Sequence, residues 1–260
     1  MNKNLNLFKR DGFVVIRKLL KKNKLKEYEK EIEKISDILI KKYKPPYVNL
    51  TKDFKVNTAH HINEIFPKSK LMKIRKIENL NRILNDVFKK RPILRNIEIF
   101  AKPPKTGLRA PFHQDNFYWN VKNKEAANVW IALDKVDKTN GGLIYLKGSH
   151  KLGIQQHSVS NVPGSSQEIN IRKINKLKFK KISPRLNPGD CIVHHCEVIH
   201  GSNRNSTQKK RRAIVVRFTA LNSRIDKKKN EKISRSIKKK IKINLINFKI
   251  MCGFIGYYDS

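Results

Sequence analysis

A histidine and an aspartate separated by one residue give this sequence its clearest chemical signal. His113 and Asp115 stand in the segment 111–115, and residues two apart on a strand face the same side. One imidazole and one carboxylate are two of the three ligands of a 2-His-1-carboxylate iron(II) site. The pair therefore predicts a metal centre that a distant histidine must complete.

Several histidines compete for the third position. His200 follows an apolar, β-branched segment and is the leading candidate. His194 and His195 lie within that predicted strand, and we interpret them as wall residues of the site. The other histidines of the chain are interpreted as surface or structural residues: His60, His61, His150 and His157. A triad completed in this way leaves three iron positions open, which a bidentate 2-oxo acid and dioxygen can fill.

A 2-oxo diacid has a second carboxylate, which needs a cation. A planar guanidinium binds a carboxylate in a bidentate manner, which an ammonium cannot do. Arg211 and Arg212 open the next predicted strand and must face opposite sides of the sheet. Arg211 shares its side with Ala213 and Val215, which leave room for a ligand. Arg212 shares its side with larger apolar residues, so we expect that side to pack against helices while its guanidinium reaches water.

The secondary structure that must position these residues is predicted to change along the chain from helices to short strands. Helical periodicity predicts helices near the start of the chain, over residues 23–42 and over residues 71–88, whereas residues 57–67 have the texture of a loop. Short strands are expected at residues 13–16, 97–101, 127–133, 142–146, 191–195 and 213–219. Helices followed by many short strands predict a mainly β fold, a barrel or sandwich buttressed by helices.

These segments, in their order and spacing, resemble the phytanoyl-CoA dioxygenase family, a branch of the iron(II)/2-oxoglutarate-dependent oxygenases. The resemblance runs from about residue 7 to residue 221, and its segments are 8–15, 112–115, 129–134, 140–143, 148–150, 188–190 and 200–202 with the following Arg211. It implies a double-stranded β-helix, a cupin-like jelly-roll barrel buttressed by the N-terminal helices. It also implies that iron is bound by His113, Asp115 and His200.

The same resemblance implies how the co-substrate is held. It places Arg211, rather than its neighbour, on 2-oxoglutarate, and it matches Trp130 and Ser202 to positions that line the co-substrate site. Lys102, on the strand before the iron motif, is a looser match. The sequence departs from the family pattern at His194-His195, where relatives usually carry an aromatic residue before one histidine.

The implied reaction is hydroxylation of an unactivated C–H bond in a small molecule, with iron(II), 2-oxoglutarate and dioxygen. Asp115 argues against a halogenase, because those relatives lose the carboxylate to free a position for halide. The 59 Lys and Arg residues against 21 Asp and Glu give a formal charge of +38, which favours an anionic substrate, nucleic acid or lipid. The lysines are dispersed, however, and we interpret most of them as coding bias. A non-catalytic basic barrel that binds nucleic acid or anionic surfaces is the alternative, although no clustered aromatic and basic motif supports it.

The remaining features concern location and the end of the chain. There is no apolar run of about 18 residues, so no membrane span is expected, and three cysteines without metal spacing favour a reduced, cytoplasmic setting. A shift in composition predicts an oxygenase domain over residues 1–225 and a basic tail over residues 226–260 outside the core. Residues 251–259 resemble the start of glutamine-hydrolysing asparagine synthases. Cys252 is internal and lacks the free α-amine that would act as its base, so we assign it no catalysis.

Overall fold

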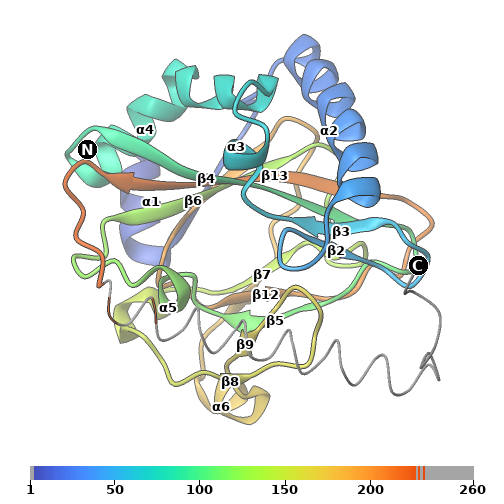
Figure 1. Cartoon of the computed structure of the whole chain (residues 1–260). Helices are drawn as coiled ribbons and strands as arrows, with labels where there is room; N and C mark the ends of the chain where they lie inside the picture. Colours follow the sequence, from blue (N-terminus) through green and yellow to red (C-terminus); the bar gives the residue numbers. More distant parts are fainter. Residues whose placement is uncertain (1–2, 227, 229–230, 232–260) are drawn as a thin grey trace.

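Two antiparallel sheets pack face to face in the computed structural model, which describes residues 3–226, 228 and 231 (Figure 1). The seven-stranded sheet contains, in spatial order, β1 (Phe13–Ile16), β11 (Cys191–His195), β6 (Ala126–Ala132), β13 (Arg211–Ala220), β4 (Pro92–Lys102), β3 (Val56–Ala59) and β2 (Val48–Leu50). The four-stranded sheet contains β10 (Lys181–Ile182), β7 (Leu143–Leu146), β12 (His200–Ser202) and β5 (Ala110–His113). A separate pair, β8 (Ser158–Val159) and β9 (Gln167–Glu168), lies on the long connection between β7 and β10.

Helices cover the outer face of the larger sheet (Figure 1). They are α1 (Lys3–Asp11), α2 (Lys22–Lys42) and α4 (Glu78–Phe88), with the short α3 (Ile62–Ile65) and the 3-10 helix η1 (Lys70–Lys76) between them. The other short helices are η2 (Ser149–Leu152), α5 (Asn116–Trp119) and α6 (Ile171–Lys176). The apolar stripe of α2, with Tyr28, Ile32 and Leu39, is buried in the main core cluster. Side chains at three- and four-residue spacing lie on one helix face, which is why this periodicity specifies a covering helix.

The long strand β13 divides its side chains between two cores. Ile214 and Val216 pack in the cluster that includes the helices, whereas Ala213 and Val215 pack in the cluster between the two sheets. This second cluster also contains Tyr145 of the smaller sheet, which stacks on Phe13 with ring centroids 4.4 Å apart. The alternation expected from the sequence is therefore confirmed for this strand, and the space between the sheets is where its inward side chains meet.

Two expectations about the helical half of the chain were wrong. The segment 57–67 is not a loop, because it contributes to β3, which pairs with β4, and to α3. The single helix expected over residues 71–88 is two pieces, since Ile77 is extended and separates η1 from α4. The first error has a physical cause: a strand of four residues gains its hydrogen bonds from a partner that is distant in the sequence.

The described part of the chain runs past the predicted domain boundary. Ile225 forms an isolated bridge with Val121, and the Asp226 amide donates to the Asn120 carbonyl at 2.9 Å. Most of the predicted tail and the segment 251–259 lie outside the described residues. Among the residues that are described, none of the helices has the length and apolar character to cross a membrane.

Candidate metal centre

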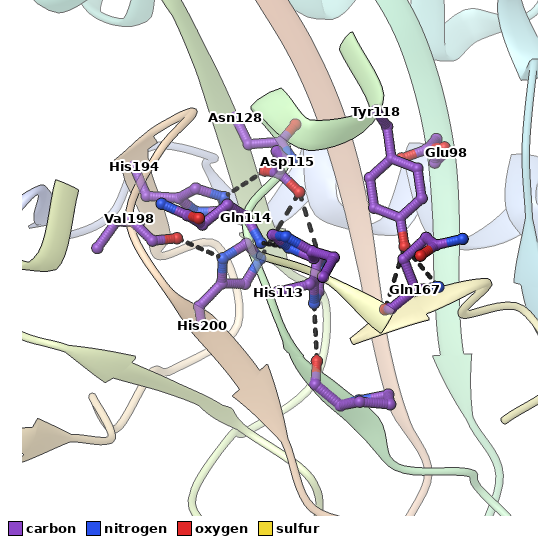
Figure 2. A network of polar contacts seen from close by, with 12 residues as sticks. Glu98, His113, Gln114, Asp115, Tyr118, Asn128, Gln167, His194, Val198 and His200 are labelled. Atoms are coloured by element: carbon purple, nitrogen blue, oxygen red, sulfur yellow. Dashed lines mark hydrogen bonds and ion pairs between the residues drawn. The ribbon is translucent and has the colours of Figure 1, made fainter. Parts of the chain in front are cut away.

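His113, Asp115 and His200 converge between the two sheets (Figure 2). Antiparallel pairing of β12 with β5 places His200 opposite His113. One atom from each of the three side chains lies within 4.8 Å of the others. Asp115 Oδ1 is 3.6 Å from His113 Nε2 and 3.8 Å from His200 Nε2. Ligand atoms at these separations can share one metal ion with bonds of about 2.0–2.2 Å, and a 2-His-1-carboxylate set suits iron(II).

The backbone reaches this geometry by a turn and not by strand alternation. β5 ends at His113, and Asp115 has helical angles (φ −60°, ψ −38°) at the start of α5. The intervening Gln114 is fully buried and bonds away from the triad, donating from Nε2 to the carbonyls of Gly153 and Glu197. The expectation that both ligands stand on one strand was therefore wrong in detail. Gln114 anchors the turn that brings the carboxylate beside the imidazole.

Each imidazole is oriented by a backbone carbonyl. His113 Nδ1 lies 2.8 Å from the Pro111 carbonyl, and His200 Nδ1 lies 3.0 Å from the Val198 carbonyl. When Nδ1 donates its proton in this way, Nε2 keeps the lone pair that a metal requires. Burial lowers the pKa of His200 to about 3, so this ligand is neutral at physiological pH and ready to bind a cation.

A buried chain of hydrogen bonds holds the second oxygen of the carboxylate. Asp115 Oδ2 accepts from Asn128 Nδ2 at 2.8 Å and from His194 Nε2 at 3.0 Å, and Tyr145 Oη donates to His194 Nδ1 at 2.9 Å. Burial alone raises the pKa of Asp115, but His200, His113 and His194 outweigh it and hold that pKa well below its usual range. The carboxylate therefore stays ionised, with Oδ1 directed at the ligand cluster.

His194 is thus more than a wall residue, because it fixes the aspartate. Its neighbour His195 faces the other way, and its ring lies 5.1 Å from that of His150 and 6.0 Å from that of Phe8. Sequence reasoning missed Asn128 and Tyr145 as partners of the site. A signal for Asn128 was present, since it is the one polar side chain in the buried strand β6 and lies two residues from Trp130.

Two buried basic side chains lie on the inner face of the larger sheet. Arg211 and Lys102 are register partners on β13 and β4, and their exposed fractions are 2% and 4%. The Arg211 guanidinium lies 5.3 Å from the Trp130 ring, donates one hydrogen bond to the Phe100 carbonyl, and leaves Nε without a partner. Lys102 Nζ donates to Ser202 Oγ at 2.6 Å.

The charges of these two residues are not compensated by any acidic side chain within ion-pair distance in the described chain. Burial lowers the pKa of Arg211 to about 9, and burial together with Arg211 lowers the pKa of Lys102 well below its usual value. Uncompensated buried charges are costly, so this pair indicates a site built for an anion. Ser202 and Trp130 lie beside this pair.

The neighbouring Arg212 points to the helical side, as expected from strand alternation. It does not reach water, however, and that expectation was wrong. Its guanidinium forms ion pairs with Asp134 at 2.9 Å, with Glu29 at 2.6 Å and with Glu33 at 3.3 Å. Glu29 and Glu33 belong to α2, so Arg212 connects that helix to the sheet, while Arg211 lies on the opposite face beside Trp130.

Comparison with known proteins gives a consistent picture. The sequence model of the family described as phytanoyl-CoA dioxygenase (PhyH) matches residues 8–213. The peroxisomal phytanoyl-CoA dioxygenase of Bos taurus is 27% identical over 232 residues, which cover 83% of this chain and 67% of that protein. The peroxisomal phytanoyl-CoA dioxygenase of Mus musculus is 27% identical over 233 residues, which cover 81% of this chain and 66% of that protein. The chain therefore spans about two thirds of the length of these relatives.

Solved structures agree on the fold. EctD from S. alaskensis with bound Fe superposes with a TM-score of 0.71 at 18% identity, covering 87% of this chain and 79% of that one. The non-heme alpha ketoglutarate dependent epimerase SnoN from nogalamycin biosynthesis gives a TM-score of 0.65 at 17% identity, with 84% and 81% covered. The resemblance of residues 251–259 to asparagine synthases receives no support from these comparisons.

Proposed function

The chain belongs to the phytanoyl-CoA dioxygenase family of iron(II)- and 2-oxoglutarate-dependent dioxygenases, and from this premise we propose that it hydroxylates an unactivated C–H bond of a small metabolite that carries an anionic group. Its cofactors are iron(II) and 2-oxoglutarate. We also propose that its two sheets form the double-stranded β-helix barrel of that family. The observation that carries the proposal is the His-Asp-His cluster facing two buried, uncompensated cations.

In this proposal each residue of the site has a defined task. His113 and His200 bind iron through Nε2 and Asp115 through Oδ1, while the outer hydrogen bonds of the three side chains keep them in place. Arg211 donates to the distal carboxylate of 2-oxoglutarate, and Lys102 adds positive charge and orients the Ser202 hydroxyl. When bound, iron and 2-oxoglutarate together with dioxygen supply the oxidising power that breaks the C–H bond.

In this chemistry the protein positions the reactants and excludes water from them. Trp130 and Val215, both almost fully buried, line the wall between the triad and Arg211 and exclude water from it. Low polarity there strengthens the contact between guanidinium and carboxylate. Cys191 and Cys196 are buried free thiols, and with their spacing in the sequence they support our proposal of a reduced, cytoplasmic setting.

Anaerobic addition of iron(II) and 2-oxoglutarate tests the proposed function. We expect a weak visible charge-transfer band in the wild-type protein and none in Asp115→Ala, with Asp37→Ala on the exposed side of α2 as the matched control. In air, the loaded protein should release succinate when a substrate is present. A wild-type protein that gives no band, and instead binds nucleic acid with a steep dependence on salt, would support the rival non-catalytic basic module.

A further inference from the structure

Two oppositely charged side chains, Arg217 and Glu98, lie on the inner face of the larger sheet without pairing with each other. Arg217 of β13 lies opposite Asn96 of β4, and Glu98 lies opposite Val215, so both charged side chains point to the same side of the sheet as Arg211. They are therefore diagonal neighbours on the inner face of this sheet. Among the ion pairs of the described residues there is none between them.

Arg217 is a half-buried guanidinium with unused hydrogen-bonding capacity. Its Nε is buried and has no hydrogen-bond partner, and its Cζ lies 5.2 Å from the centre of the Trp119 ring. Burial lowers the pKa of Arg217, and of the charged groups around it Glu98 counteracts this most. A planar guanidinium that lies over an aromatic ring and lacks an acceptor at Nε is well prepared to bind a carboxylate.

Glu98 is prepared for a cation in a similar way. Its Oε1 lies 2.6 Å from His60 Nδ1, and no described residue bonds Oε2. The side chain of Glu98 keeps 21% of its surface exposed, and that of His60 keeps 18%, so the carboxylate is only partly covered by the protein. His60 is thus not a plain surface residue, because it fixes one oxygen of this carboxylate and leaves the other available.

Both groups lie near the metal centre. Arg217 is the register partner of Asn128, which donates to the metal-ligating Asp115. In Figure 2, Glu98 and Tyr118 lie on one side of the His113 imidazole and His194 lies on the other. Arg211 and Lys102, the residues proposed to hold the co-substrate, lie further along the same face of the sheet. Val215 and Ala213 separate Arg217 from Arg211 on that face. A molecule held by Arg217 and Glu98 would therefore be beside the iron, away from 2-oxoglutarate.

We propose that the substrate is a small zwitterion of the amino-acid class, whose carboxylate binds Arg217 and whose ammonium binds Glu98. This inference rests on the proposed function, and it narrows the substrate class from an anionic metabolite to one that carries both charges. A purely anionic substrate would meet the Glu98 carboxylate, and a long hydrocarbon chain would leave the Arg217 guanidinium without an acceptor, which is costly. A zwitterion satisfies both groups at once.

Matched sets of ligands test the proposal by calorimetric binding, with turnover measured separately. Each L-amino acid is compared with its N-acetyl derivative, which keeps only the carboxylate, and with its carboxamide, which keeps only the ammonium; octanoate represents apolar anions. In the wild-type protein we expect the preferred amino acid to bind at least tenfold more tightly than either derivative. Arg217→Gln should abolish the preference for the amino acid over its carboxamide. Glu98→Gln should abolish the preference for the amino acid over its N-acetyl derivative. Arg82→Gln, an equal loss of charge on the exposed face of α4, should change neither.

The design separates this proposal from the one on which it rests. Both variants should keep the charge-transfer band with iron(II) and 2-oxoglutarate, which shows that their fold and metal centre are intact, and Arg217→Lys should restore part of the carboxylate preference. Absence of the band in the wild-type protein overturns the proposed function. The calorimetric preference for the amino acid over its two derivatives decides the substrate class independently of that result. Tighter binding of octanoate or of the N-acetyl forms, equal weakening of all ligands in both variants, or no binding of any amino acid overturns the zwitterion proposal.

Discussion

Arg211 and Lys102 face each other across β13 and β4, both almost fully buried, and no carboxylate of the described chain pairs with either. Desolvation lowers the pKa of both groups. A folded protein does not retain two adjacent buried cations without a reason, because each carries a desolvation penalty of several kcal/mol. Under the proposed function, this pair is one half of an ion pair whose other half is the co-substrate carboxylate.

Replacing each of the two adjacent arginines by alanine in turn distinguishes their roles. Arg211→Ala should raise the 2-oxoglutarate concentration needed for half-maximal succinate release by about a hundredfold or more, since a buried contact between guanidinium and carboxylate is lost. Arg212→Ala should leave that concentration nearly unchanged. It should instead lower the free energy of unfolding by about 1–3 kcal/mol in urea titrations, because Asp134 and Glu29 lose their partner. The reverse pattern would show that the assigned strand register is off by one residue.

Removal of the carboxylate ligand should abolish iron binding and hydroxylation. Asp115→Ala leaves two imidazoles and also removes the acceptor of the hydrogen bonds from His194 and Asn128. Anaerobic titration with iron(II), followed by metal analysis of the desalted protein, measures the loss. An Asp115→Ala protein that retains stoichiometric iron would mean that other residues hold the metal.

The hydrogen-bond chain behind the carboxylate should tune iron affinity. His194→Phe removes one of the two donors to Asp115 Oδ2, and we expect iron(II) to bind about 10–100-fold more weakly. Tyr145→Phe removes only the more distant donor to His194 and should have a smaller effect. Competition with a chelator of known affinity ranks the two variants. Equal effects would indicate that Tyr145 acts through packing against His200 and not through its hydroxyl.

Acid should destabilise the metal-free protein. Burial lowers the pKa of His157 to about 4 and that of His195 to about 3, below the value of about 6.5 in an unfolded chain. Between these values the unfolded state binds more protons, so stability is fully present above pH 6.5 and is lost as the pH falls. We expect about 1 kcal/mol or more per imidazole between pH 7.5 and pH 5 in urea titrations. His157→Gln should flatten the dependence, and an unchanged slope would contradict this assignment.

The basic tail should contribute little to the core. A chain that ends at Asp226 keeps the bridge between Ile225 and Val121 and every element of both sheets. We expect it to retain the charge-transfer band and a melting temperature within a few degrees of that of the full chain. A fall of ten degrees or more would show that the tail is structural.

The sequence predicted what depends on local pattern and missed what depends on distant partners. The β-branched segments and the spacing of His113, Asp115 and His200 were sufficient to predict the main strands and the metal cluster. Strand alternation placed Arg211 and Arg212 on opposite faces of the sheet, and the family resemblance assigned Arg211 to the co-substrate. The acidic partners of Arg212 lie 78 residues (Asp134), 179 residues (Glu33) and 183 residues (Glu29) earlier in the chain, however, so nothing near it in the sequence shows that its charge is compensated. The strand β3 was missed for a related reason, since four residues acquire strand character only by pairing with β4.

The orphaned guanidinium of Arg211 also bears on how long the protein survives in a cell. A ligand that binds only the folded state adds RT ln(1 + [L]/Kd) to its stability, and here that ligand is a central metabolite. When 2-oxoglutarate is scarce, two unbalanced charges remain in the interior and the unfolded fraction rises, which exposes the chain to proteases. The amount of enzyme should then follow the supply of its co-substrate, without any separate regulator.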